Sequence, residues 1–119
     1  MVVVIFELWV AEGRTREYFD LAASLRSELE QIDGFVSIER FESVTTPGKF
    51  VSLSFWRDEE SVSRWRNVEE HRRAQALGRG GIFADYRLRV ASIIRDYGLH
   101  TRDEVPADNR GLHDRGGRE

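Results

Sequence analysis

Two ionisable side chains, His71 and Glu7, are the best candidates for chemistry in this sequence. A histidine can take a proton near neutral pH, or bind iron through its imidazole. Glu7 interrupts a run of apolar residues, where a carboxylate either needs a partner or is available as a base. We therefore predict His71 and Glu7 as the catalytic residues.

Each candidate also has a purely structural explanation. His71 could lie at the edge between a helix and the sheet, hydrogen-bonded to a neighbour or paired with Glu69 or Glu70. Glu7 could be held in an ion pair, and an arginine of the last predicted strand is the natural partner. The sequence leaves both alternatives open.

Three aromatic side chains are predicted to shape an apolar pocket for a small aromatic ligand. They are Trp65, Trp9 and Phe55. Large flat side chains suit the walls of such a pocket, although Trp65 could equally be an ordinary core residue.

Charged residues on the predicted strands favour ion pairing over catalysis. Glu39 and Arg40 are adjacent on one strand, so they lie on opposite faces, and we predict structural ion pairs for them. Asp85, Arg87 and Arg89 share one face of the last strand, which favours a ladder of charges with neighbouring strands.

The composition of the 119 residues excludes several classes of function. There is no cysteine, which rules out zinc-thiolate sites, iron–sulfur clusters and thiol nucleophiles, and we expect no metal. The net charge of −3 argues against nucleic acid as a partner. The apolar run at the N-terminus is too short to cross a membrane, so we expect no membrane association and a cytoplasmic location.

Hydrophobic periodicity and turn residues predict six elements in the order β-α-β-β-α-β. The predicted strands are 2–10, 35–43, 50–56 and 82–95. The first helix follows the turn at 11–13 and ends at Asp33 and Gly34. The second begins after Asp58 as N-cap, breaks near Asn67 and ends at the glycine-rich stretch 78–81.

This order predicts a ferredoxin-like α+β domain over residues 1–100, with an antiparallel sheet and both helices on one face. Residues 101–119 form a charged tail, either loosely ordered or packed on a partner subunit. The first strand is apolar on both faces. The open face of the sheet therefore needs a cover, and we predict a homodimer formed through it.

A short repeat of aromatic positions, here called the echo, supports two half-units with similar structures. Trp9 and Trp56 each end a strand, and an aromatic residue, Tyr18 or Trp65, follows nine positions later. The echo predicts that each tryptophan contacts the aromatic residue of the next helix.

Several motifs resemble the antibiotic biosynthesis monooxygenase (ABM) family. They are the stretches 34–43, 47–49 and 53–58, followed by Trp65-Arg66, Glu70-His71-Arg72, Gln75, Gly78-Arg79 and 83–86. The resemblance covers about residues 2–97. It implies a dimeric α+β barrel with a pocket between the sheet and the helices of each subunit.

The same resemblance implies three functions. Some ABM proteins oxidise aromatic substrates with O2 and no dedicated cofactor, which would make His71 or Glu7 the base. Others bind and degrade heme through a helix histidine, the role that His71 would take. Glu7 stands about where those proteins have an asparagine. The third possibility is a non-catalytic dimeric module that binds a ligand or a protein.

Overall fold

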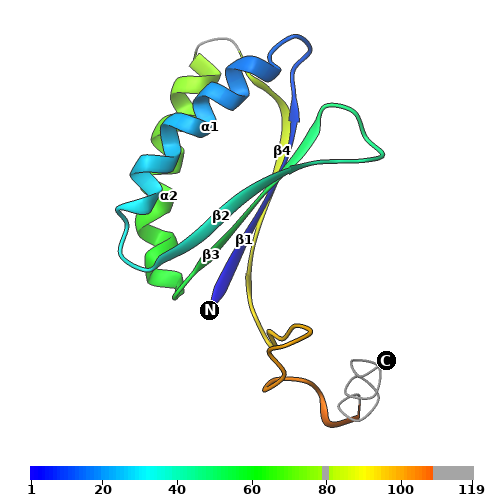
Figure 1. The fold of residues 1–119 in the computed structure, drawn as a ribbon. Coiled ribbons are helices and arrows are strands. Elements are labelled where there is room, and N and C mark those ends of the chain that lie inside the picture. Colours follow the sequence, from blue (N-terminus) through cyan, green and yellow to red (C-terminus); the bar gives the residue numbers. More distant parts are fainter. Residues whose placement is uncertain (79–80, 109–119) are drawn as a thin grey trace.

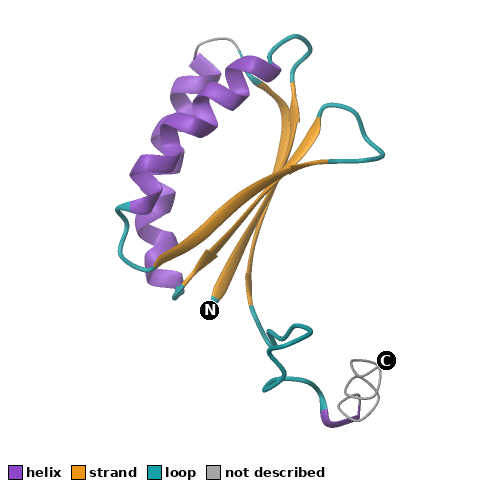
Figure 2. Ribbon diagram, viewed as in Figure 1, coloured by secondary structure: helices purple, strands orange, loops and turns teal. Residues whose placement is uncertain are grey.

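The centre of the fold is a twisted four-stranded sheet, and both helices lie on one of its faces (Figures 1 and 2). The computed structural model describes residues 1–78 and 81–108, without the side chains of 69–78. Its elements are β1 (Val2–Val10), α1 (Thr15–Glu30), β2 (Phe35–Glu42), β3 (Lys49–Trp56), α2 (Glu59–Gly78) and β4 (Phe83–Ser92). The predicted element order and the ferredoxin-like α+β class are confirmed.

The strands lie in the order β2-β3-β1-β4, and every neighbouring pair is antiparallel. Phe6 of β1 pairs with Ser52 of β3 and with Leu88 of β4. Because successive side chains of a strand point to opposite faces, the even-numbered residues of β1 and β3 face the helices. Their odd-numbered residues face the open side of the sheet.

Helix α1 covers the sheet with a single stripe of buried side chains. They are Tyr18, Ala22, Leu25 and Leu29. This spacing returns to the same face of a helix at every turn, as predicted. The helix ends at Glu30, however, earlier than the predicted stop at Asp33 and Gly34.

Two predicted features of the second half need correction. Helix α2 runs without interruption from Glu59 to Gly78, so the predicted break near Asn67 is wrong. It contains no proline, and its one glycine is its last residue, so nothing in its sequence forces a kink. Strand β4 stops at Ser92 instead of Arg95, because its partner β1 begins at Val2, which pairs with Ser92.

The buried apolar residues form two clusters between the helices and the sheet. One contains Phe6, Leu8, Tyr18, Ala22, Phe50 and Ile82. The other contains Val4, Leu29, Ile38, Trp56, Val62 and Trp65. The core is therefore divided along the length of the sheet.

Only one of the two predicted aromatic pairs exists. The rings of Trp56 and Trp65 are 5.7 Å apart, centroid to centroid, as the echo predicts. Trp9 does not meet Tyr18, because Trp9 lies on the open face of the sheet. Tyr18 contacts Phe50 instead, at 5.3 Å between ring centroids.

Residues beyond β4 leave the sheet and extend past its end (Figure 1). The described part, 93–108, contains a turn in which the Gly98 N–H donates to the Thr101 carbonyl at 2.8 Å. Val105 in this segment is only 5% exposed. In the described part of the chain, neither helix has the length and apolar character needed to cross a membrane.

Gly34 allows the connection between α1 and β2 to approach the start of α2. Its φ is +95°, and a Cβ built at this position would lie 1.8 Å from Oγ of Ser61, a residue that is fully buried. Gly13 also has a positive φ, of +77°, but a Cβ there would meet no atom within 4 Å. A side chain at Gly13 would therefore meet backbone strain alone, whereas one at Gly34 would also overlap with Ser61.

We predict that Gly34→Ala lowers the free energy of unfolding by roughly 2–5 kcal/mol, the sum of a left-handed backbone penalty and a steric overlap. The matched control Gly13→Ala costs only about 1–2 kcal/mol, from the backbone term alone. Urea denaturation of both variants measures the difference. Equal losses would show that the approach to Ser61 is unimportant.

Candidate functional site

A pocket lies between the sheet and the helices, where the two core clusters meet. Its walls are mostly apolar and come from both clusters. The lining residues are Phe6, Tyr18, Leu21, Ala22, Leu25, Leu29, Ile38, Arg40, Ser52, Trp65 and Phe83. Of the predicted pocket residues, Trp65 is in this wall, and it is also part of the core, with 7% of its surface exposed.

One row of paired residues forms the floor of the pocket. Phe6 of β1, Ser52 of β3 and Arg40 of β2 are neighbours across the strands. Ser52 is 7% exposed and carries a small side chain where a larger apolar residue would fill the core. Its signal in the sequence is a polar residue at an inward position of a buried strand, which our sequence reasoning missed.

The enclosed part of the pocket is small. Its volume is about 30 Å³, and the hollow with its open mouth measures about 480 Å³. Most lining residues are buried, whereas Leu21, Arg40 and Phe83 are half-buried. These three lining residues also meet solvent, Arg40 at the β2 edge of the sheet and Phe83 at the β4 edge.

Arg40 provides a positive charge at the β2 edge of the pocket. The prediction of structural ion pairs for Glu39 and Arg40 is wrong within the described part of the chain, where neither residue has an ion pair or side-chain hydrogen bond. The two side chains lie on opposite faces of β2, as predicted, because Arg40 pairs with the inward Ser52 and Glu39 with the outward Leu53. Arg40 therefore faces the pocket with its charge available.

The structure does not bring the other predicted site residues to this pocket. Glu7, Trp9 and Phe55 have odd positions on β1 and β3, so they face the open side of the sheet. The Glu7 carboxylate forms ion pairs with Arg89 at 2.9 Å and with Lys49 at 3.5 Å. The Lys49 ammonium also lies 4.8 Å from the Trp9 ring centroid. Glu7 thus has the ion-pair partner on the last strand that the sequence allowed.

His71 belongs to α2, six residues after Trp65, and its side chain is outside the described residues. Its role therefore stays a prediction. Among the side chains that the structure describes, no group of three or more histidines and carboxylates is arranged to hold a metal ion.

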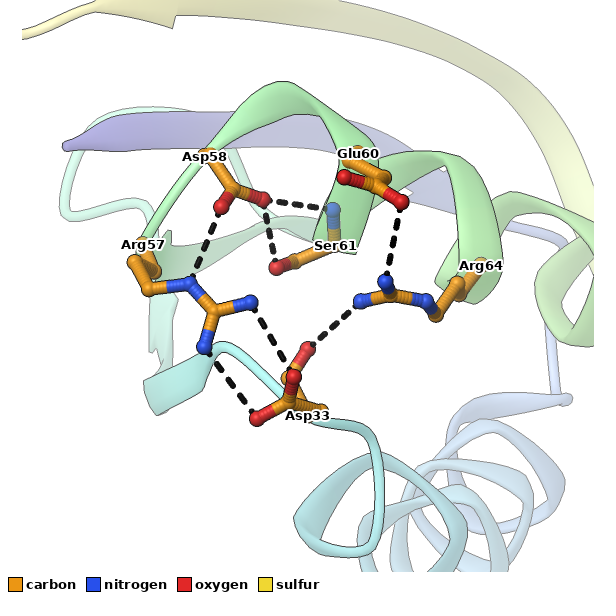
Figure 3. Close-up of polar contacts among 6 residues, drawn as sticks. All are labelled: Asp33, Arg57, Asp58, Glu60, Ser61 and Arg64. Atoms are coloured by element: carbon orange, nitrogen blue, oxygen red, sulfur yellow. Dashed lines mark hydrogen bonds and ion pairs between the residues drawn. The ribbon is translucent and has the colours of Figure 1, made fainter.

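A polar cluster fixes the start of α2, the helix that carries Trp65 (Figure 3). Asp58 is the predicted N-cap, and its Oδ1 accepts hydrogen bonds from the Ser61 N–H at 2.8 Å and the Ser61 hydroxyl at 2.7 Å. This satisfies a backbone N–H that would otherwise lack a partner in the first turn. The direction of α2 is therefore set one turn before Trp65.

Arg57 and Arg64 tie this helix start to the loop after α1 (Figure 3). The Arg57 guanidinium donates two hydrogen bonds to the Asp33 carboxylate, both at 3.1 Å, and a third to Asp58 at 2.9 Å. Arg64 donates to the Asp33 backbone carbonyl at 3.2 Å and to Glu60 at 3.1 Å. Both helices are thereby positioned over the same end of the sheet.

These contacts perturb the ionisation of the cluster. The hydrogen bond from the Ser61 hydroxyl, followed by that from Arg57, holds the pKa of Asp58 far below its ordinary value. Hydrogen bonding by Arg57 also lowers the pKa of Asp33. The two carboxylates in turn raise the pKa of Arg57, with Asp33 as the larger cause.

Comparison with known sequences gives a family and a fungal relative. The model of the antibiotic biosynthesis monooxygenase family matches residues 1–77. A protein named jasmonate monooxygenase ABM, from Pyricularia oryzae, is 46% identical over 93 residues, which are 78% of this chain but only 43% of the fungal protein. The uncharacterised protein YqjZ of Bacillus subtilis is 28% identical over 92 residues, 77% of this chain and 78% of that protein.

Solved structures share the fold at low sequence identity. A candidate antibiotic biosynthesis monooxygenase from Deinococcus radiodurans has a TM-score of 0.70 and 14% identity, over 82% of this chain and 97% of its own. The heme degrader MhuD of Mycobacterium tuberculosis was solved with two hemes in its active site. It has a TM-score of 0.63 and 20% identity, over 82% of this chain and 100% of its own. At these identities the likeness shows the fold alone.

The lowered pKa of Asp58 predicts a pH-dependent stability. Because the folded-state pKa lies below the ordinary value of 3.8, the carboxylate stabilises the fold fully above that value. This contribution is lost as the pH falls toward the depressed pKa. Asp58→Asn should therefore be less stable than the wild type at neutral pH, and the gap should close in acid. Urea midpoints measured down to about pH 2 test this, and a gap independent of pH would contradict it.

Proposed function

The chain belongs to the antibiotic biosynthesis monooxygenase family, and we propose that it oxidises a small, largely apolar aromatic molecule bound between the sheet and the helices. The observation that carries this proposal is the pocket at the junction of the two core clusters. Its walls offer Trp65 and Phe6 to the faces of a flat ring, and Ser52 offers the ring a hydroxyl.

Binding requires movement at the mouth of the pocket. The enclosed volume of about 30 Å³ is well below the roughly 300–1,000 Å³ of typical ligand pockets. A ring therefore enters only when the half-buried Leu21 and Phe83 side chains turn aside. Closure behind the ring would then exclude bulk water from the reaction.

The proposed reaction needs no electron donor besides the substrate. A base removes the proton of a phenol, and the electron-rich ring reacts with O2 at an unsubstituted ring carbon. One oxygen atom stays on that carbon and gives a quinone. The other leaves as water with the phenolic hydrogen and the ring hydrogen, so the substrate supplies all the electrons. We propose His71 as the base, since the Glu7 carboxylate lies on the opposite face of the sheet.

The fungal relative supports a second class of substrate. Its name refers to jasmonate, which is built on a cyclic ketone, and 93 residues of this chain align with it at 46% identity. Hydroxylation of such a molecule consumes two electrons that the ring does not supply. Assays with jasmonate therefore include a reduced nicotinamide as the electron donor.

Heme is the ligand of a structural neighbour, but this pocket does not fit it as it stands. A porphyrin is far larger than the enclosed 30 Å³, and its entry would require the helices to separate from the sheet. Heme therefore has no part in the proposed reaction. A hemin titration with absorbance detection, compared with His71→Ala, tests this alternative directly.

We also propose a homodimer formed through the open face of the sheet. Alternate residues on this face are apolar and only half-buried in the single chain. They are Val3, Ile5, Val51, Leu53 and Phe55. A twofold contact between two such faces would bury them, together with the ion pairs of Glu7.

Oxygen consumption with simple phenols and naphthols tests the proposed oxidation. Ser52→Val adds about one methyl group to the pocket floor, which fills the enclosed space, so turnover should fall about tenfold or more. The control Ser92→Val makes the same change at the exposed end of β4, and it should keep full activity. His71→Ala should lower turnover by about 100- to 10,000-fold if His71 is the base.

These variants also define what would overturn the proposal. Absence of O2 uptake by the wild type across the phenols and jasmonate would leave a binding module as the better description. Unchanged turnover in Ser52→Val would place the reaction outside this pocket. Unchanged turnover in His71→Ala would remove His71 as the base.

The dimer is tested by the mass of the particle in solution, measured by light scattering after size-exclusion chromatography. Leu53 lies in the middle of the open face, opposite Ile5, so Leu53→Asp would bury a carboxylate at the interface and should give a monomer. Ile94→Asp changes a side chain that is 83% exposed beyond β4 and should remain dimeric. A monomeric wild type would contradict the proposal.

A further inference from the structure

Arg40 occupies an unusual position at the edge of the sheet. It lies on β2, one of the two edge strands, at the end of the row that runs from Phe6 through Ser52. Its side chain is half-buried and lines both the pocket and a second, open hollow along the edge of β2. The Arg40 side chain therefore borders both the apolar pocket and the open hollow.

No carboxylate of the described part of the chain neutralises this charge. Other arginines near this side of the molecule are paired, Arg26 with Glu30 at 3.1 Å and Arg57 with Asp33 at 3.1 Å. Glu39 shares the outer hollow with Arg40 but lies on the opposite face of β2 and makes no ion pair with it. A half-buried arginine that lines an apolar pocket, with no counter-ion in the described part of the chain, is well placed to bind an anion.

We propose that Arg40 selects substrates that carry a carboxylate, so that the preferred substrate is an aryl-alkanoic acid and not a neutral arene. This inference rests on the proposed function, because it uses the same pocket. The planar guanidinium can donate two parallel hydrogen bonds to a carboxylate. The ring then lies over Phe6 and Ser52, and the carboxylate stays at the β2 edge of the pocket, beside Arg40.

The spacing of the strands sets the length of such a substrate. Phe6 and Arg40 are two strands apart, which corresponds to about 10 Å between their backbones. Both side chains project from the same face of the sheet, so the ligand itself has to span this distance. A ring over Phe6 with a linker of two or three carbons to its carboxylate does so once the hydrogen bonds to Arg40 are included.

Two probes that differ only in charge test the inference. They are meta-hydroxyphenylpropanoate and its methyl ester, which share the same phenol. Isothermal titration calorimetry should give at least about tenfold tighter binding of the acid by the wild type. Arg40→Gln should weaken binding of the acid by about 10- to 100-fold and leave that of the ester within about twofold. Arg40→Lys keeps the charge but loses the bidentate geometry, so it should bind the acid more weakly than the wild type and more tightly than Arg40→Gln.

Arg16→Gln is the matched control, because it removes the same charge from a side chain that is 90% exposed on α1 and outside the pocket lining. It should bind both probes as the wild type does. Equal binding of acid and ester, no binding of the acid, or an equal loss in Arg16→Gln would overturn the inference.

Oxygen uptake separates this inference from the proposed function. Arg40-dependent binding of the acid without O2 consumption would support the inference and contradict the proposed oxidation. Oxidation of acid and ester at equal rates, unchanged in Arg40→Gln, would support the proposed oxidation and overturn the inference.

Discussion

The alternation of side chains across β1 and β3 is the constraint on which both surfaces of the molecule depend. Strand β1 carries apolar residues on both faces, and β3 carries buried residues on one face and half-buried ones on the other, so each face of the sheet needs a cover. The helices cover one, and Phe6 and Ser52 there become the floor of the pocket. The opposite face keeps Glu7 and Trp9, so a shift of one residue in register would exchange the two sets.

The pocket itself arises from an incomplete core. Two apolar clusters meet over Ser52, and its small side chain leaves space between them that a branched apolar residue would fill. Such a gap is a specific feature, because protein interiors tolerate few voids. Arg40, which pairs with Ser52 on the neighbouring strand, adds a positive charge to the lining of this otherwise mostly apolar pocket.

The polar cluster around Asp58 connects this pocket to the rest of the fold. It joins the loop after α1 to the first turn of α2 through Arg57 and Asp33. Trp65 lies one turn further along α2 and forms part of the pocket wall. Surface ion pairs of this kind contribute little stability individually. The close approach of Gly34 to Ser61 also holds the loop after α1 against the first turn of α2. The function of the cluster is therefore to orient α2.

The sequence by itself determined the element order, the N-cap at Asp58 and the two apolar faces of β1, because these follow from local periodicity and turn chemistry. It could not determine which face the helices cover. We therefore assigned Glu7, Trp9 and Phe55 to one pocket with Trp65, although the sheet separates them. Ser52 and Arg40 became site residues only through strand pairing, which joins positions 12 to 46 residues apart in the chain. Such pairings are decided by how the whole chain packs, and no local pattern encodes them.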